Sequence, residues 1–137
     1  MILTVTVAWG QSIVGRWKAI NDEDNSEESI VEFAESDGEF YGKIVKLFPK
    51  PGEDPNPTCH DCSEDDPRFG KSVIGMIVLE GLKKRDRNKW EDGEFLDWRN
   101  GAVYSCYLEL VDKDKLKLRA FIGFSLLGRT QYWKRVK

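Results

Sequence analysis

Cys59 and Cys62, which enclose His60 and Asp61, are the residues of this chain whose types and spacing come closest to reactive chemistry. A closed tetrahedral zinc site needs four ligands, and one Cys-x-x-Cys pair supplies two. His60, the single histidine, points away from its neighbour Cys59 in an extended chain, so it is a poor third ligand. A thioredoxin-type redox motif would begin a helix after a strand, whereas this one lies among prolines. We therefore predict no metal site, and a Cys59–Cys62 disulfide in an oxidising compartment.

Side chains suited to catalysis are equally sparse. A nucleophile needs a base beside it, and His60 is the one imidazole available. Two pairs of carboxylates lie close together in sequence, Glu91 with Asp92 and Glu94 with Asp97. Such pairs can act as acid and base, but on charge-rich hairpins they are far more often solvated turn residues. We expect no catalytic residues, no cofactor and no enzyme activity.

Two short stretches, one basic and one apolar, have compositions that suit a binding surface better than a catalytic site. Residues 83–87 place four cations in five positions. They suit an anionic headgroup or an acidic partner, although a solvated hairpin tip is the commoner structure for such a run. Residues 124–127 are apolar where a turn is expected. They either plug one end of a barrel or form a partner surface, and the plug is favoured because exposed apolar patches are uncommon on soluble monomers.

The composition indicates a single globular domain. The chain has 137 residues, of which 40% are hydrophobic and 33% charged, with a formal net charge of −3. That length supports a genuine core, and the charge balance lacks the excess of Lys and Arg typical of nucleic-acid binding. No run of about 18 apolar residues is present, so we expect no membrane-spanning helix.

The third cysteine, Cys106, lies in an apolar alternating run and is predicted to be a small buried hydrophobe.

The first ten residues are similar to a truncated export signal. Ile2–Trp9 is mostly apolar, and Ala8-Trp9-Gly10 places small residues where signal peptidase cleaves, which would leave Gln11 as the mature start. No positively charged segment precedes the run, and the run is short. A first strand is the alternative, because Thr4–Val7 also suits a strand. We predict a signal remnant at 1–10 and one domain at 11–137.

Most of the remaining chain has the period of β-strands. In Lys115–Ile122, apolar residues alternate with lysine and arginine, as in a strand with one buried face. Asp37-Gly38 and Asn100-Gly101 are strong hairpin signals. After an opening segment at 15–20, the expected strands are 29–35, 40–48, 73–82, 90–97, 103–111, 115–122 and 129–136, with 83–89 a basic turn. A short helix is the alternative for 73–82, which is apolar on both faces. Eight or nine short strands at hairpin spacing are typical of an all-β antiparallel barrel or sandwich. Of these we predict a single antiparallel up-and-down barrel.

Residues 49–69 form a long interruption in this pattern. The segment holds all five prolines, both cysteines of the Cys-x-x-Cys pair and six acidic residues. Proline lacks the donor that a sheet needs, so we predict a long Pro-rich loop. Irregular loops of this length are usually functional or mobile, and the Cys59–Cys62 pair is expected to pin this one.

Several segments together resemble a bacterial family catalogued as domain of unknown function 2147. They are Gly15–Lys18, Tyr41–Leu47 with Cys59–Cys62, and, most specifically, Leu116–Gly123 running into Ser125–Trp133. Ile74–Met76 and Gly93–Tyr104 add weaker matches, so the resemblance covers nearly everything from residue 15 onward. Two departures are visible. The family usually has Asp-Pro where this chain has Asp97-Trp98, and Arg-Gly where it has Arg119-Ala120, so the turn geometry at Asp97 is not carried over.

The resemblance implies an exported protein of unknown biochemical role with a lipocalin-like (calycin-like) fold. Lipocalins begin with Gly-x-Trp, here Gly15 and Trp17, and an arginine near the end of the chain packs over that tryptophan. Arg129 or Arg135 is placed to do so. A guanidinium over an indole contributes about 0.5–2 kcal/mol and closes one end of the barrel. Structural roles are therefore expected for Gly15, Trp17, Arg129 and Trp133.

A small barrel encloses either packed side chains or one small ligand. We expect non-catalytic binding of a small hydrophobic or amphipathic ligand in a cavity lined by Val31, Phe33, Tyr104, Leu108, Leu116 and Leu118. The alternative is a filled barrel that acts as an envelope structural or protein-interaction module, through the 49–69 loop and residues 124–127. The expected location is the bacterial periplasm or the outside of the cell.

Overall fold

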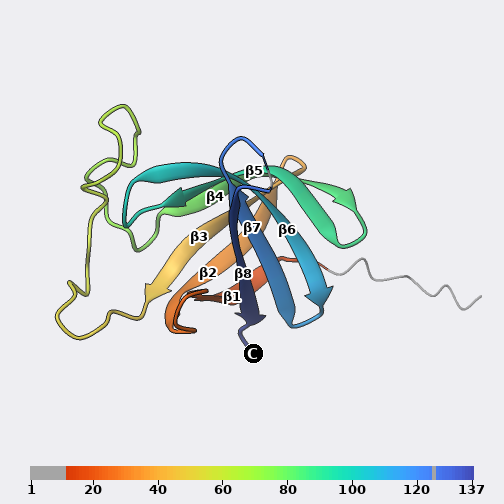
Figure 1. The fold of residues 1–137 in the computed structure, drawn as a ribbon, viewed down its shortest axis with the longest axis horizontal. Helices are drawn as coiled ribbons and strands as arrows, with labels where there is room; N and C mark the ends of the chain where they lie inside the picture. The colour runs from red at the N-terminus through yellow and green to blue at the C-terminus, as the bar shows by residue number, and fades with distance from the viewer. Residues whose placement is uncertain (1–11, 125) are drawn as a thin grey trace, which may run out of the picture.

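Eight antiparallel strands close into a barrel in the computed structural model, which describes residues 12–124 and 126–137 (Figure 1). The strands are β1 (Gly15–Ile20), β2 (Glu27–Ser36), β3 (Glu39–Leu47), β4 (Ile77–Asp86), β5 (Lys89–Asp97), β6 (Ala102–Asp112), β7 (Lys115–Phe121) and β8 (Gly128–Arg135). Each strand pairs with the next along the chain, and β1 pairs with β8 to close the ring. The prediction of an all-β, up-and-down barrel is therefore confirmed.

Tight turns join the strands where the sequence supplies residues that accept a positive φ. Asp37 and Gly38, between β2 and β3, have φ values of 53° and 81°. A two-residue hairpin of this kind needs positive φ at both positions because its twist then matches that of the strands. At the opposite end, Gly101 has a φ of 76° in the predicted Asn-Gly turn between β5 and β6.

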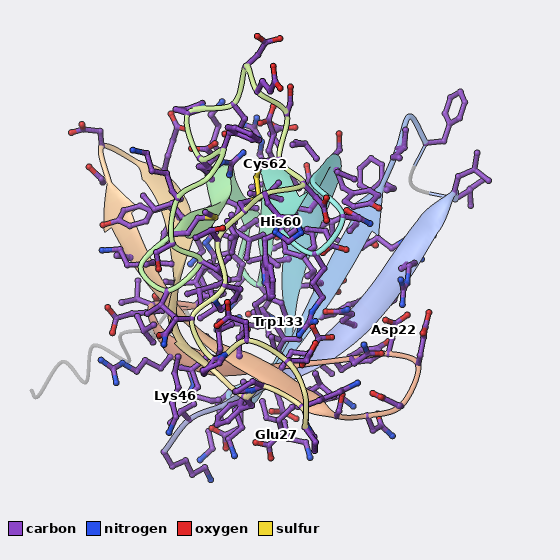
Figure 2. The ribbon with its side chains drawn as sticks, turned by 90° about the vertical axis from the view of Figure 1, so that its left-hand side faces the viewer. Asp22, Glu27, Lys46, His60, Cys62 and Trp133 are labelled. Carbon is purple, nitrogen blue, oxygen red and sulfur yellow. A yellow bond between two sulfur atoms is a disulfide. The ribbon has the colours of Figure 1, made fainter. Side chains whose placement is uncertain are left out.

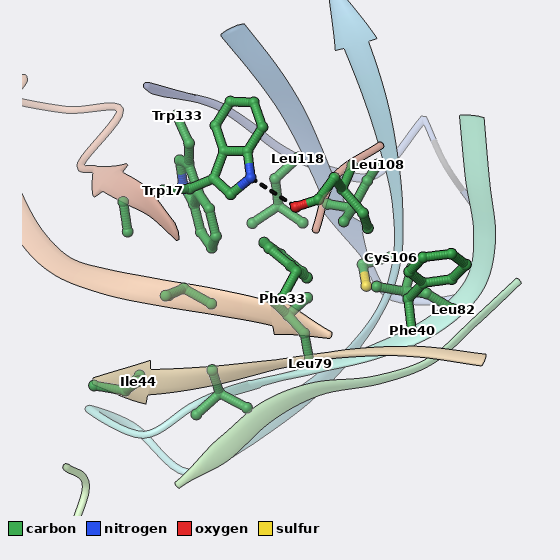
Figure 3. Packing of buried hydrophobic residues seen from close by; sticks show 14 of the residues in the cluster. Trp17, Phe33, Phe40, Ile44, Leu79, Leu82, Cys106, Leu108, Leu118 and Trp133 are labelled. Carbon is green, nitrogen blue, oxygen red and sulfur yellow. Dashed lines mark hydrogen bonds between the residues drawn. The ribbon is translucent and has the colours of Figure 1, made fainter. Parts of the chain in front are cut away.

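The core follows the period-two pattern. In β7, Leu116 and Leu118 are buried, while Lys115 is exposed and Lys117 is half-buried. Three indoles fill most of the interior: Trp17, Trp90 and Trp133 are fully buried. Phe33 packs against Trp133 with 6.3 Å between ring centroids, and Figure 3 shows Phe33 beneath the Trp17 and Trp133 rings. This part of the barrel is packed solid with side chains.

The two ends of the barrel differ. One end, called the closed end below, carries the short turns at 37–38, 87–88 and 113–114. The other, called the open end, carries the segments 21–26, 48–76, 98–101 and 122–127. The 48–76 segment is the long Pro-rich loop, and it extends to one side of the barrel (left in Figure 1).

The closed end is sealed by Trp17 and Arg135. The Trp17 indole donates its N–H to the carbonyl of Ile13 (2.9 Å; dashed in Figure 3). The guanidinium of Arg135 lies over the Trp17 ring, 4.3 Å from the centroid. It also donates to the carbonyls of Ser12, at 2.9 Å, and Lys113, at 2.7 Å. Arg135 thereby joins the segment before β1 to the β6–β7 turn at the closed end.

Some expected boundaries were wrong. Residues 83–86 belong to β4, and the turn contains Arg87 and Asn88 rather than the whole basic run 83–89. The register explains this, because Lys83 pairs with Glu91 and Lys84 pairs with Trp90. Residues 73–76 are part of the long loop and not of β4. The signal remnant or extra strand expected at 1–10 lies outside the described residues.

Candidate functional site

An apolar cavity of about 370 Å³ lies at the open end of the barrel. It forms where strands β5 to β8 end, because Ala120 is a small inward residue between larger neighbours. Ala120 pairs with Cys106 on β6 and with Arg129 on β8. The cavity is lined by Phe95, Asp97, Tyr104, Leu118, Ala120, Phe121, Ile122, Leu127, Gly128, Arg129 and Gln131.

Two aromatic rings form one wall of this open-end cavity. Phe95 on β5 pairs with Tyr104 on β6, and their rings stack with 6.5 Å between centroids. Stacked rings are a rigid apolar surface, since each has few rotatable bonds. This wall and the aliphatic side chains of β7 give the cavity its apolar character.

The charged and amide groups of the cavity lining are Arg129 and Gln131 on β8 and Asp97 at the end of β5. Arg129 donates to both carboxylate oxygens of Asp22, at 2.7 and 3.1 Å, and to Glu23 at 3.1 Å. Gln131 donates to Asp22 at 3.3 Å and accepts the indole N–H of Trp133 at 2.9 Å. A hydrogen-bonded chain therefore runs from a buried indole to the rim, and it fixes the side chains that border the cavity.

The ionisation of Asp22 follows from these contacts. Partial burial by itself raises the pKa of this carboxyl, but the hydrogen bonds from Arg129, the backbone and Gln131 outweigh it and hold the pKa below its usual value. The same Asp22 contact raises the pKa of Arg129. The pair therefore stays charged at neutral pH, and Arg129 is already satisfied by acidic partners.

A second, smaller cavity of about 190 Å³ adjoins the first and shares four of its lining residues: Phe95, Asp97, Arg129 and Gln131. Glu28 borders it, and burial raises the pKa of Glu28 despite the Arg99 guanidinium 3.7 Å away. Val31 lies deeper on the same side. Together the two cavities give the open end an apolar region beside a rim of charged and amide groups.

The six residues expected to line a ligand cavity fall into two groups. Tyr104 and Leu118 line the open-end cavity, and Val31 lines the second. Phe33, Leu108 and Leu116 lie in the packed core of the barrel and border neither of these cavities. The expected set thus divides between the cavities of the open end and the packed core.

Of the two arginines considered as the partner of Trp17, one has that role and the other lies at the opposite end of the barrel. Arg135, and not Arg129, covers Trp17. Arg129 lies at the other end of β8, where it binds Asp22 and borders both cavities. Gly15 has a φ of 123° at the start of β1, and Trp133 is buried in the core.

The prediction that residues 124–127 plug one end of the barrel is wrong for the side chains that the structure describes there. Phe124 and Leu126 are largely exposed, and Leu127 contributes only to the edge of the open-end cavity. The backbone N–H of Leu127 bonds the carbonyl of Phe124 (2.9 Å) in this turn. Ser125 lies outside the described residues.

The Cys-x-x-Cys loop is pinned to the side of the barrel. Cys59 and Cys62 form a disulfide, with 5.4 Å between their Cα atoms, and both are buried. A Cβ on Gly101 would overlap the carbonyl of Asp61, so only glycine lets the β5–β6 turn approach this loop. His60 is exposed and faces the viewer in Figure 2 near Cys62. No group of three His, Cys, Asp or Glu side chains that could hold a metal was found in the described part of the chain.

Sequence reasoning missed the polar side of the cavity. Arg129 and Gln131 share the inward face of β8 with Trp133, so their period-two spacing was an available signal. Asp22 gave no such signal, because it lies in a turn 107 residues before Arg129 and meets it only through closure of the barrel.

The closed barrel, and the indole covered by an arginine at one end, are features of a lipocalin-like fold. A comparison with solved structures supports this fold. The chain is similar to a protein described as "Protein HP1028 from the human pathogen Helicobacter pylori belongs to the lipocalin family". The TM-score is 0.78 at 20% sequence identity, over 92% of this chain and 84% of that chain. At this identity the likeness establishes the fold.

The family is established by sequence. The model of the family described as "Uncharacterized protein conserved in bacteria (DUF2147)" matches residues 15–135. The chain therefore belongs to that family. No curated protein sequence matches the chain. The described residues include no helix long and apolar enough to cross a membrane.

Proposed function

We propose that this protein binds a small amphipathic ligand in the open-end cavity, without catalysing a reaction on it. The observation that carries the proposal is the cavity itself, a mostly apolar space of about 370 Å³ whose lining includes the polar residues Asp97, Arg129 and Gln131. Ligand sites are typically concave, mostly apolar and about 300–1,000 Å³ in volume, with a few polar groups that fix orientation.

The lining suggests how such a ligand would lie. Its apolar part would pack against the Phe95–Tyr104 wall and Leu118, and its polar part would lie near Asp97 and Gln131. Arg129 is bound by Asp22 and Glu23, so an anionic head would have to displace existing ion pairs. A ligand with a neutral or hydrogen-bonding head therefore fits these contacts better than a free fatty acid does.

The proposed location is the periplasm or the outside of a bacterial cell. The Cys59–Cys62 disulfide supports it, since such bonds persist in oxidising compartments and are rare in the cytosol. Export by a signal peptide belongs to the same proposal.

The test is displacement of an environment-sensitive naphthylamine dye by single-chain alcohols, amines and carboxylates of equal length. The chain offers a matched pair of variants: Ala120→Phe fills the cavity, while Ser105→Phe adds the same ring to an exposed outward position on β6. We expect saturable dye binding by the wild type and by the Ser105→Phe protein, and at least about tenfold weaker binding by the Ala120→Phe protein. Equal binding by both variants, or no saturable binding by the wild type, would contradict the proposal.

The packed core favours a second candidate function, that of a structural or protein-interaction module of the cell envelope. Trp17, Phe33 and Leu116 fill the barrel interior, and the long loop is fixed to the β5–β6 turn through Gly101. A rigid loop on a filled barrel is a suitable platform for a protein partner. Absence of saturable dye binding would make this the leading candidate.

A further inference from the structure

The loop between β7 and β8 exposes a cluster of large apolar side chains, called the apolar tip below. Ile122 is 65% exposed, Phe124 74%, Leu126 89% and Leu127 68%. Scattered single hydrophobic residues on a surface are ordinary, but a contiguous group of this kind marks an interaction site. The tip is held by backbone bonds from Leu127 to Phe124 and from Ile122 to Leu127.

The two strands that carry the apolar tip are basic. Neither β7 nor β8 contains an aspartate or a glutamate. Lys115, Lys117 and Arg119 follow one another at every second position of β7, opposite the inward Leu116 and Leu118. They therefore share the outer face of the barrel, at intervals of about 7 Å. Lys134 lies directly opposite Lys115 on β8.

Aromatic rings hold two of these lysines in place. The Lys115 ammonium lies 4.8 Å from the centroid of the Tyr132 ring, and the Lys117 ammonium lies 5.7 Å from that of Tyr107. Lys89 covers the same Tyr107 ring at 4.7 Å. Since cations already occupy positions over these rings, the rings are poor platforms for stacking nucleic-acid bases. The outer face therefore offers fixed positive charge beside amphipathic tyrosines.

The acidic residues near this hairpin lie on its neighbours and not on its own strands. Glu109 and Asp112 on β6 lie opposite Lys117 and Lys115. At the open end Asp22 and Glu23 are bound by Arg129, and Asp24 is bound by Lys50 at 3.0 Å. The long acidic loop leaves the barrel between β3 and β4, away from β7 and β8 (Figure 1). The hairpin β7–β8 thus combines an exposed apolar end with a cationic side.

We propose that the β7–β8 hairpin docks the protein on a lipid bilayer that contains anionic lipids. The apolar tip enters the interface between headgroups and acyl chains, and the lysine row of β7 lies against the anionic headgroups. Apolar insertion and electrostatic attraction are the two contributions that together give stable interfacial binding. The proposal does not depend on a ligand in the open-end cavity, although Ile122 and Leu127 belong both to the tip and to the cavity edge.

The first test places an environment-sensitive dye on a cysteine introduced by Leu126→Cys, with Ile74→Cys as the matched control. Ile74 is also an exposed aliphatic residue but lies in the long loop between β3 and β4. The native Cys106 thiol will not compete for the dye, because it is buried and burial raises its pKa to about 12. With vesicles of phosphatidylglycerol and phosphatidylcholine, we expect a blue shift of emission at position 126 and none at 74. No shift at 126, or an equal shift at both positions, would overturn the proposal.

The second test separates the two contributions by vesicle sedimentation. The double variant Phe124→Ser with Leu126→Ser should bind at least about tenfold more weakly than wild type to mixed vesicles. The double variant Lys115→Glu with Lys117→Glu should lose the preference for vesicles with phosphatidylglycerol over pure phosphatidylcholine.

The matched charge control is Lys83→Glu with Arg87→Glu, which changes two exposed cations on β4 and the turn after it. It should remain within about threefold of wild type, because screening limits the reach of distant charges. Wild-type protein that stays in the supernatant with both kinds of vesicle, or a control that weakens binding as much as the β7 variant does, would overturn the proposal.

Discussion

Arg135 makes more contacts at the closed end than its place near the end of the chain would suggest. It covers the Trp17 ring and donates to carbonyls on either side of it, those of Ser12, Val14 and Lys113. The residue thereby joins the segment before β1 to the turn between β6 and β7. A lysine could supply the charge but not this planar set of donors.

Replacing Arg135 with alanine should lower the free energy of unfolding by about 2 kcal/mol, the sum of a lost cation–π contact and unsatisfied carbonyls. Arg135→Lys should retain only part of the free energy of unfolding that Arg135→Ala loses. Arg16→Ala is the control, since Arg16 makes an exposed ion pair with Glu32, and such pairs contribute about 1 kcal/mol or less. Urea unfolding measures all three; equal losses for Arg16→Ala and Arg135→Ala would show that Arg135 has no special role.

The sequence could not decide between Arg129 and Arg135 as the partner of Trp17. Both lie on β8, at positions separated by an even number of residues, so a period-two pattern treats them alike. The choice depends on which end of β8 meets β1. The register decides it, because Trp17 pairs with Arg135.

At the scale of elements, the long loop is anchored well beyond its disulfide. Cys59 donates its N–H to Lys71 and accepts from Gly70, and Val73 donates to Pro57. These bonds form a short ladder that closes the 57–73 segment on itself. The sequence predicted an irregular, pinned loop from its prolines and cysteines. It could not predict the contact with Gly101, which depends on tertiary packing.

Reduction of Cys59–Cys62, or the variant with both residues changed to serine, should therefore loosen the loop without unfolding the barrel. The bond closes a very short loop, for which the chain-entropy relation gives about 2 kcal/mol. Hydrogen–deuterium exchange should quicken at amides of the 57–73 segment while β6 and β7 stay protected. Global unfolding after reduction would show that the loop is part of the main core.

The same loop should respond to acid. The Arg68 guanidinium donates two hydrogen bonds, of 2.9 and 2.8 Å, to the Asp66 carboxylate, and both side chains are mostly buried. The bonds from Arg68 lower the pKa of Asp66. Because the pKa of Asp66 is lower in the folded state, the ionised carboxylate stabilises the fold at pH values above its ordinary pKa of about 3.8. This contribution to stability is lost as the pH falls below that value.

We expect Asp66→Asn to cost about 1–2 kcal/mol at neutral pH and to flatten the decline of stability below about pH 4. Unfolding free energies measured at a series of pH values give the comparison. A variant curve parallel to the wild-type curve would show that the Asp66–Arg68 pair does not contribute to the acid response.

At the scale of the whole molecule, the barrel has a packed half and, at the open end, a half that contains the cavity. Alternation of apolar and charged residues was enough to predict the strands, but it fitted a barrel and a sandwich equally, and the family resemblance favoured the barrel. It could not tell which inward residues would meet a cavity, since Leu116 and Leu118 look alike in sequence. The difference arises from their layers: Leu116 lies opposite Trp133, whereas Leu118 lies opposite Gln131 and next to the small Ala120.

The measurement that tests this account most directly is a methyl NMR titration of the whole protein with a single-chain alcohol. The account predicts saturable shifts of the Leu118, Ala120 and Leu127 methyl groups, which line the open-end cavity. Methyl groups of Leu108 and Leu116, in the packed half, should stay in place. Shifts centred on Leu108 and Leu116, or no saturable shift at any methyl group, would contradict it.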